Sequence, residues 1–203
     1  MKENLEKFFA DKKAEADKSL DLWEAAVMLP GIETAQGQGV LFEVRSSKLK
    51  WQPGDICFPG GRRDKIDASP KDTARREVSE ELQIPLNDVK VYGPLEYFYT
   101  YSGPVLYPFV GTIKDSSKIN ANKDEVSELF TISLATLVDM KPRETEMTIA
   151  SKPQEDFPFD LVPYYSKEWY KRRNYKLYFY EYEDKVIWGM TARVLHNFIE
   201  KIK

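Results

Sequence analysis

Residues 58–84 constrain this chain more than any other stretch, because two adjacent glycines there precede a helix with a clear start. Ser69 can cap that helix through its side-chain oxygen, and Pro70 suits the first helical position, where its missing N–H costs nothing. Asp72 follows three residues after Ser69, in a variant of the capping box. The pattern predicts a helix from Pro70 to about Leu82, entered from a glycine-rich turn.

Three glutamates share one face of the predicted helix. At about 100° per residue, Glu77, Glu80 and Glu81 lie within roughly 100° of one another. Gathered carboxylates repel, and Mg²⁺ or Mn²⁺, which prefer oxygen ligands, would turn that repulsion into ligation. Arg76 precedes Glu80 by one turn and could hold it in position. The neighbouring apolar stripe, which should face the core, consists of Ala74, Val78 and Leu82.

The alternative interpretation of the three glutamates is a solvated acidic face without a ligand, since most charge runs on helices are solvated faces. The glycines at positions 60 and 61 favour a ligand site, because glycine lets the backbone approach a bound group closely. Divalent cations in such sites commonly serve phosphate chemistry. The sequence therefore predicts a metal-dependent reaction at phosphate.

The same segment resembles the signature of the Nudix hydrolases, G-x5-E-x7-R-E-U-x-E-E-x-G-U, in which U is a bulky aliphatic residue. Gly61 matches the first glycine, and residues 76–84 match the second half. Asp67 stands where the family has its first glutamate, with one extra residue between it and Arg76. Gln83 replaces the last glycine, at a position where φ is usually positive, and should cost about 1 kcal/mol there. The resemblance implies an α/β/α sandwich with a mixed β-sheet.

A second pattern, upstream, resembles the coenzyme A pyrophosphatase branch of that family, L-L-T-x-R-[SA]-x3-R-x3-G-x3-F-P-G-G. Residues 41–61 follow its spacing. The departures from the pattern are Phe42, Glu43 and Lys50. This resemblance implies metal-dependent hydrolysis of coenzyme A, and of acyl derivatives, to adenosine 3′,5′-bisphosphate and 4′-phosphopantetheine.

For the site, the resemblance implies that Glu77 and Glu81 ligate Mg²⁺ or Mn²⁺, with Glu80 as a third ligand or as the base that orients water. A distal acidic residue can also join the metal or act as base in this family. The nearest candidates are Glu125 and Glu128, in a stretch that otherwise reads as a solvated turn. The identity of the base stays open among Glu77, Glu80, Glu125 and Glu128. The predicted catalytic residues are Arg76, Glu77 and Glu80.

Cations that precede or follow the glycines are the candidates for binding substrate. Coenzyme A carries a pyrophosphate and a 3′-phosphate, and the planar fork of Arg45 suits phosphate, while Lys50 offers a point charge. Arg62 and Arg63, in the predicted turn after Gly61, could serve similarly, and Gly61 is itself a predicted substrate-binding residue. A charged loop beside an acidic site is the alternative interpretation.

Two other functions remain open. One is a Nudix pyrophosphatase for ADP-ribose, NADH or a dinucleotide. The other is a nucleotide-sensing module without catalysis, which Asp67 and Gln83 keep open, although all three clustered glutamates are present.

Composition bounds the remaining possibilities. The 203 residues are expected to form one domain, 1–203, with a charged amphipathic helix over residues 1–20. A net charge of −3 argues against general nucleic-acid binding, and no apolar run approaches the roughly 20 residues needed to span a membrane. The single cysteine, Cys57, and the absence of a secretory signal predict a cytoplasmic protein. Nudix proteins are often dimers, so a homodimer is possible.

Local patterns give the remaining elements. The helix with the glutamates is expected to follow the third strand. A short helix is expected at residues 134–139, and a closing helix is expected at residues 191–203. Strands are expected at residues 25–29, 40–45, 89–101, 105–113, 176–182 and 186–188.

Overall fold

The computed structural model describes residue 10, residues 22–34 and residues 37–203. Apart from residue 10, the helix predicted over residues 1–20 lies outside these ranges. Within them, no helix is both long enough and apolar enough to cross a membrane.

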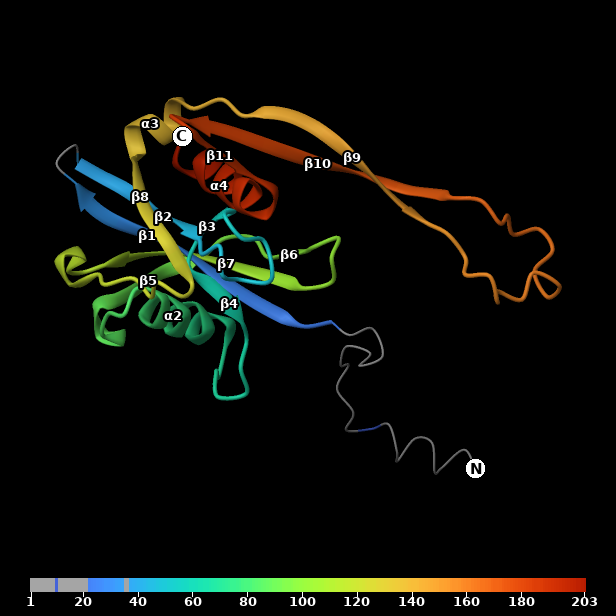
Figure 1. Ribbon diagram of the computed structural model, residues 1–203, viewed down its shortest axis with the longest axis horizontal. Coiled ribbons are helices and arrows are strands. Elements are labelled where there is room, and N and C mark those ends of the chain that lie inside the picture. The colour runs from blue at the N-terminus through green and yellow to red at the C-terminus, as the bar shows by residue number, and fades with distance from the viewer. Residues whose placement is uncertain (1–9, 11–21, 35–36) are drawn as a thin grey trace.

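A mixed β-sheet forms the centre of the molecule (Figure 1). Its main path runs in the order β3 (Ile56–Cys57), β2 (Gly37–Arg45), β1 (Glu24–Thr34), β7 (Val105–Ile113) and β5 (Val89–Pro94). Strands β1 and β7 are parallel, with Glu24 opposite Val105 and Gly31 opposite Thr112, and the other pairs are antiparallel. Shorter or additional strands join this path: β4 (Gly60–Arg62) on β1, β6 (Phe98–Tyr99) on β7 and β8 (Val126–Ser133) on β2.

Both faces of the sheet are covered, and β1 shows why. Its side chains alternate, so Ala26 and Met28 pack on one face while Ala25 and Leu29 pack on the other. All four are buried, as expected of a strand with a hydrophobic layer on each side. The alternation thus produces the three-layer α/β/α arrangement that the family resemblance implies.

Helix α2 (Pro70–Glu81) covers the first face. Its apolar stripe enters the core as predicted, and Ala74, Val78 and Leu82 are fully buried. They pack with residues of the sheet and of the segment after the helix: Ala26, Met28, Leu41, Ile84, Val89, Phe109 and Ile113.

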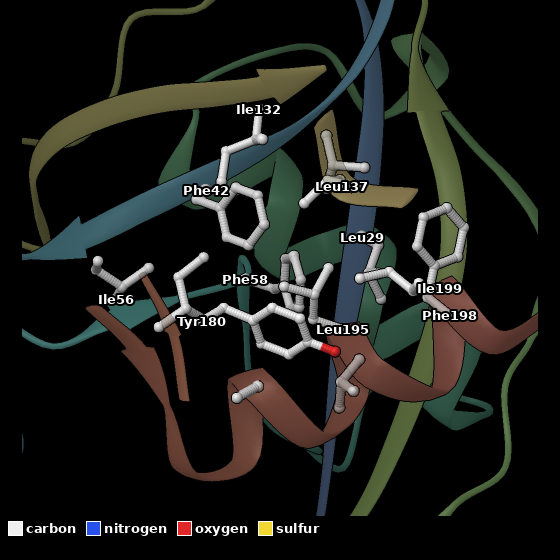
Figure 2. Packing of buried hydrophobic residues seen from close by; sticks show 14 of the residues in the cluster. Leu29, Phe42, Ile56, Phe58, Ile132, Leu137, Tyr180, Leu195, Phe198 and Ile199 are labelled. Atoms are coloured by element: carbon white, nitrogen blue, oxygen red, sulfur yellow. The ribbon is translucent and has the colours of Figure 1, made fainter. Parts of the chain in front are cut away.

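Helix α4 (Gly189–Ile202) and the short helix α3 (Leu134–Asp139) cover the opposite face. Figure 2 shows Leu195 and Ile199 of α4 pointing toward Leu29 and Phe42 of the sheet, with Tyr180 among them. Two 3-10 helices, η2 (Leu86–Asp88) and η3 (Ser116–Lys118), lie in the connections.

A second sheet contains β11 (Lys185–Trp188), β10 (Tyr170–Tyr182) and β9 (Arg143–Ser151) in that order. The paired strands β9 and β10 extend well beyond the body of the molecule (Figure 1). At the base of this arm, the ring of Tyr175 lies 5.3 Å from that of Tyr101, and the Arg193 guanidinium lies 4.4 Å from the Tyr175 ring.

The predicted elements are largely confirmed. The strand at 105–113 and the helix at 134–139 have the predicted bounds. The prediction of a turn around residues 124–130 was wrong beyond its first residues, because β8 starts at Val126 and pairs along its length with β2. Strand β9 was missed because its sequence is polar and its pairing with β10 creates it.

The glycine segment also differs from prediction. Gly60 and Gly61 lie in the short strand β4, paired with Ala26 and Val27 of β1, rather than in a turn. Helix α2 therefore follows the fourth strand and not the third. The sequence alone could not distinguish a glycine-containing turn from a short glycine strand, because glycine has low strand propensity and only pairing with β1 fixes its backbone.

Candidate active site

The ends of helix α2 match the sequence prediction. Ser69 is the N-cap, its hydroxyl oxygen accepts the Asp72 N–H at 3.4 Å, and Pro70 opens the helix. Gln83, just past the Leu82 cap, has a φ of +50°, the left-handed conformation expected for the family's glycine.

The glycine strand lies directly against two of the glutamates. The Gly60 N–H donates to Glu81 Oε2 at 2.9 Å. A Cβ atom on Gly61 would lie 2.5 Å from Glu77 Oε1, and one on Gly60 would collide with the Ala26 carbonyl oxygen. Gly60 therefore requires glycine for its approach to the backbone of β1, whereas a side chain on Gly61 would displace the Glu77 carboxylate.

The three predicted metal ligands do not share one environment. Glu81 is 6% exposed, whereas the side chains of Glu77 and Glu80 are 15% and 59% exposed. Burial raises the pKa of Glu81 well above its ordinary value, and the nearby charge of Glu43 adds to the effect. Burial also raises the pKa of Glu77, against the opposing effect of Arg76. Glu77 and Glu81 face β4, and Glu80 turns toward Arg76.

Arg76 holds the outer part of the cluster together. Its Nε and Nη2 atoms donate to Asp67 Oδ1 and Oδ2, both at 3.0 Å, and it pairs with Glu77 and Glu80 at 2.8 Å each. Asp67 Oδ2 also accepts from the Thr73 hydroxyl at 3.0 Å. Hydrogen bonds from Arg76 are the main reason why the pKa of Asp67 falls to about 2. Asp67 therefore holds the Arg76 guanidinium in position.

Glu43 belongs to the carboxylate cluster, and sequence reasoning did not assign it to the site. It lies on β2, is 1% exposed and comes within hydrogen-bonding reach of Glu81. Burial raises its pKa to about 8, partly offset by the charge of Arg45. The available signal was its departure from the branch pattern, which has threonine at this position.

The two distal candidates separate in space. Glu125 lies just before β8, where its carbonyl oxygen accepts the Ser46 N–H at 2.8 Å. Its charge raises the pKa of Glu43, Glu77 and Glu81 alike, so it lies within electrostatic reach of the cluster. Glu128 pairs instead with Lys185 at 3.0 Å. The structure brings Glu125 to the site and leaves Glu128 outside it.

A cleft of about 200 Å³ opens beside β4. Gly61, Arg62 and Arg45 line it, as predicted for substrate-binding residues, whereas Lys50 is exposed and absent from the lining. The Arg45 Nε and Nη2 atoms donate to the Trp51 carbonyl oxygen at 3.3 and 3.2 Å, which fixes the guanidinium. Aromatic rings form much of the remaining wall, namely Trp23, Tyr101 and Trp188.

The donor chemistry of the cluster fits a divalent cation. No three Asp, Glu, His or Cys side chains of the described ranges converge in a geometry ready to hold one. Yet Glu77 and Glu81 are poorly solvated carboxylates with raised pKa values, and a hard cation would favour their ionised forms. Glu77 and Glu80 both pair with Arg76 at 2.8 Å, so a metal would compete with that guanidinium for either carboxylate.

The mixed sheet between helical layers and the carboxylate-bearing helix beside a glycine strand match the arrangement that the family resemblance implies. A family profile described as the NUDIX domain matches residues 23–151, and the chain belongs to this family. It is accordingly a member of the Nudix hydrolase family.

Curated relatives extend the match along most of the chain. An uncharacterized Nudix hydrolase NudL of Pectobacterium atrosepticum is 33% identical over 175 residues, which cover 86% of this chain and 80% of the relative. A protein of the same name from Salmonella dublin is 33% identical over 181 residues, 89% of this chain and 83% of the relative.

Among solved structures, a MutT/nudix family protein from Enterococcus faecalis aligns with a TM-score of 0.50. The alignment covers 98% of this chain and 67% of that one, at 14% identity. At that identity the likeness supports the fold alone.

Proposed function

We propose that this Nudix hydrolase cleaves the pyrophosphate of coenzyme A and its acyl derivatives. The observation that carries the proposal is the cleft beside Gly61, whose wall includes both Arg45 and Arg62. The upstream pattern that resembles the coenzyme A branch contains Arg45, and the cleft brings this residue to the same cavity as the glycine strand. The products would be adenosine 3′,5′-bisphosphate and 4′-phosphopantetheine.

The chemistry of the cleft wall supports a substrate with several phosphates and an aromatic base. Guanidinium groups bind phosphate oxygens through paired hydrogen bonds, and Arg45 is already oriented by the Trp51 carbonyl. Trp23 and Trp188 line the cleft, and indole rings are suited to stacking on adenine. The thiol end of coenzyme A lies far from the cleaved bond, so acyl groups should be tolerated.

In this proposal Glu77 and Glu81 hold Mg²⁺ or Mn²⁺. When bound, the cation would supply charge stabilisation at the pyrophosphate oxygens. Glu80 or Glu125 accepts a proton from the attacking water, whose oxygen forms a bond to one phosphorus while the bridging P–O bond breaks. Arg76 keeps Glu77 and Glu80 oriented through its ion pairs at 2.8 Å.

A second candidate is a Nudix pyrophosphatase for ADP-ribose, NADH or a dinucleotide. The position of Lys50 favours it, because this residue occupies a cation position of the coenzyme A pattern but does not line the cleft. A sensing module without catalysis is the third candidate, and the lack of a ready three-ligand geometry in the described ranges is the feature that favours it.

Hydrolysis of coenzyme A beside ADP-ribose, NADH and a dinucleoside polyphosphate, with Mg²⁺ or Mn²⁺, tests these alternatives. We expect adenosine 3′,5′-bisphosphate, separated by chromatography, as the main product from coenzyme A. Faster cleavage of another substrate would contradict the coenzyme A assignment, and saturable binding without turnover would support the sensing module.

Two variants sharpen the test. Glu77→Gln should abolish turnover while the circular dichroism spectrum stays unchanged, because a carboxylate ligand is lost without a change of shape. Arg45→Ala should raise the Michaelis constant for coenzyme A by about tenfold or more, and Lys50→Ala is the matched control that should not. An unchanged constant in Arg45→Ala would rule out its contact with substrate.

A further inference from the structure

Glu43 is a buried carboxyl group with too few partners. The residue is 1% exposed, and its Oε1 atom has no hydrogen-bond partner within the described ranges. Its Oε2 atom is 4.0 Å from Cys57 Sγ, a weak donor at that distance. Burying such a group without compensation is costly, and native proteins rarely do so without an ion, a water or a catalytic role to explain it.

Strand β2 of the sheet places Glu43 near the end of helix α2. Alternation along β2 sends Glu43 to the same face as Leu41, which packs against Ala74 and Val78 of the helix. Glu43 thereby meets Glu81 in the same buried space. Two poorly solvated carboxyl groups in contact are unfavourable unless a proton or a cation lies between them.

We propose that Glu43 is an additional cation-binding carboxylate, which completes an oxygen site with Glu77 and Glu81. A hard cation takes several oxygen ligands and would satisfy both the unpartnered Oε1 atom and the contact between the two carboxyl groups. The inference rests on the metal dependence proposed above. The proposal also gives a role to the glutamate at position 43, where the branch pattern has threonine. A threonine side chain cannot supply a negative charge.

Direct measurement of Mn²⁺ binding, without substrate, tests the proposal. Electron paramagnetic resonance of free Mn²⁺ would give dissociation constants for the wild type, for Glu43→Gln and for the control Glu144→Gln. The control removes the same charge from the second sheet, where Glu144 pairs with Lys176 at 2.8 Å. We expect binding about tenfold or more weaker in Glu43→Gln and unchanged in the control.

Stability without metal separates a ligand from a structural residue. Glutamine removes a buried acid, so the metal-free melting temperature of Glu43→Gln should equal or exceed that of the wild type, while the upward shift caused by Mn²⁺ should shrink. A lower metal-free melting temperature with wild-type Mn²⁺ affinity would overturn the proposal, because Glu43 would then serve the fold alone.

Two further measurements keep the test decisive. If Glu43→Gln does not fold, Glu43→Thr restores the residue of the branch pattern and should show the same loss of Mn²⁺ affinity. Anomalous scattering from wild-type crystals with Mn²⁺ should place the ion against a Glu43 oxygen, and an ion bound without Glu43 would overturn the proposal. No Mn²⁺ binding to the wild type would contradict metal-dependent hydrolysis as well, whereas unchanged affinity in Glu43→Gln contradicts only the role of Glu43.

Discussion

Asp67 and Arg76 face each other in a two-point ion pair at the entrance to helix α2, with both N···O distances at 3.0 Å. The Asp67 side chain is 3% exposed. The same guanidinium reaches Glu77 and Glu80, each at 2.8 Å. A loop carboxylate, shielded from water, thus sets the position of the arginine that orients two glutamates of the candidate site.

Asp67→Asn should destabilise the protein by about 2 kcal/mol, because it removes hydrogen bonds between charged groups in a buried setting. Asp67→Glu keeps the charge and restores the family's residue, so it should lose less. Urea unfolding of both variants at neutral pH gives the free energies. Equal losses in the two variants would show that shape, and not charge, matters at this position.

The same pair predicts an acid-sensitive part of the stability. The pKa of Asp67 in the folded protein is about 2, below its ordinary value, so ionised Asp67 stabilises the fold above about pH 4 and this contribution disappears as the pH falls through about 2. The difference in unfolding free energy between wild type and Asp67→Asn should therefore stay constant from neutral pH to about pH 4 and shrink from there to about pH 2. A difference that is independent of pH would contradict the ion pair.

Gly61→Ala should impair catalysis while the fold survives. The new methyl group would lie 2.5 Å from Glu77 Oε1, the free end of a flexible side chain, so the carboxylate would move rather than the backbone. We expect a fall in kcat of about tenfold or more, because misplacement by about 1 Å is costly at a reacting centre. Gly93→Ala is the control, since a Cβ atom there meets nothing within 4 Å. Equal activity of both variants would contradict the close approach.

Gln83 should be a site of removable backbone strain. Its φ of +50° favours glycine, although its Oε1 atom accepts the Asn120 Nδ2 donor at 2.9 Å. Gln83→Gly and Gln83→Ala both lose that hydrogen bond, and only glycine relieves the conformation. Gln83→Gly should therefore be more stable than Gln83→Ala by about 1 kcal/mol in chemical denaturation. Equal stabilities would show that the strain is negligible.

Glu125 and Glu128 should differ in their effect on turnover. Glu125 acts electrostatically on the carboxylate cluster, whereas Glu128 is occupied by Lys185 at 3.0 Å. If Glu125 is the base, Glu125→Gln should lower kcat by about 10²-fold, and Glu128→Gln should not lower it. An unchanged kcat in Glu125→Gln would indicate that the base is one of the glutamates of α2.

Much of the fold followed from local sequence signals. The Ser69 cap, the apolar stripe of Ala74, Val78 and Leu82, and the strand over 105–113 all follow from capping and periodicity, which depend on neighbours along the chain. Strand β9 did not, because its residues are polar and its backbone is ordered by pairing with β10. The short strand of Gly60 and Gly61 likewise exists only through its contact with β1.

The candidate site divides in the same way. By itself the sequence determined that Glu77, Glu80 and Glu81 share a helix beside two glycines, since the helical period fixes their spacing. Only the tertiary structure decided that Glu80 turns to Arg76, that Glu125 and not Glu128 approaches the cluster, and that Lys50 lies outside the cleft. The tertiary structure also decided that Glu43 is buried against Glu81. A contact between a strand and a helix that are far apart in the chain depends on how the layers pack. Periodicity within either segment cannot encode that packing.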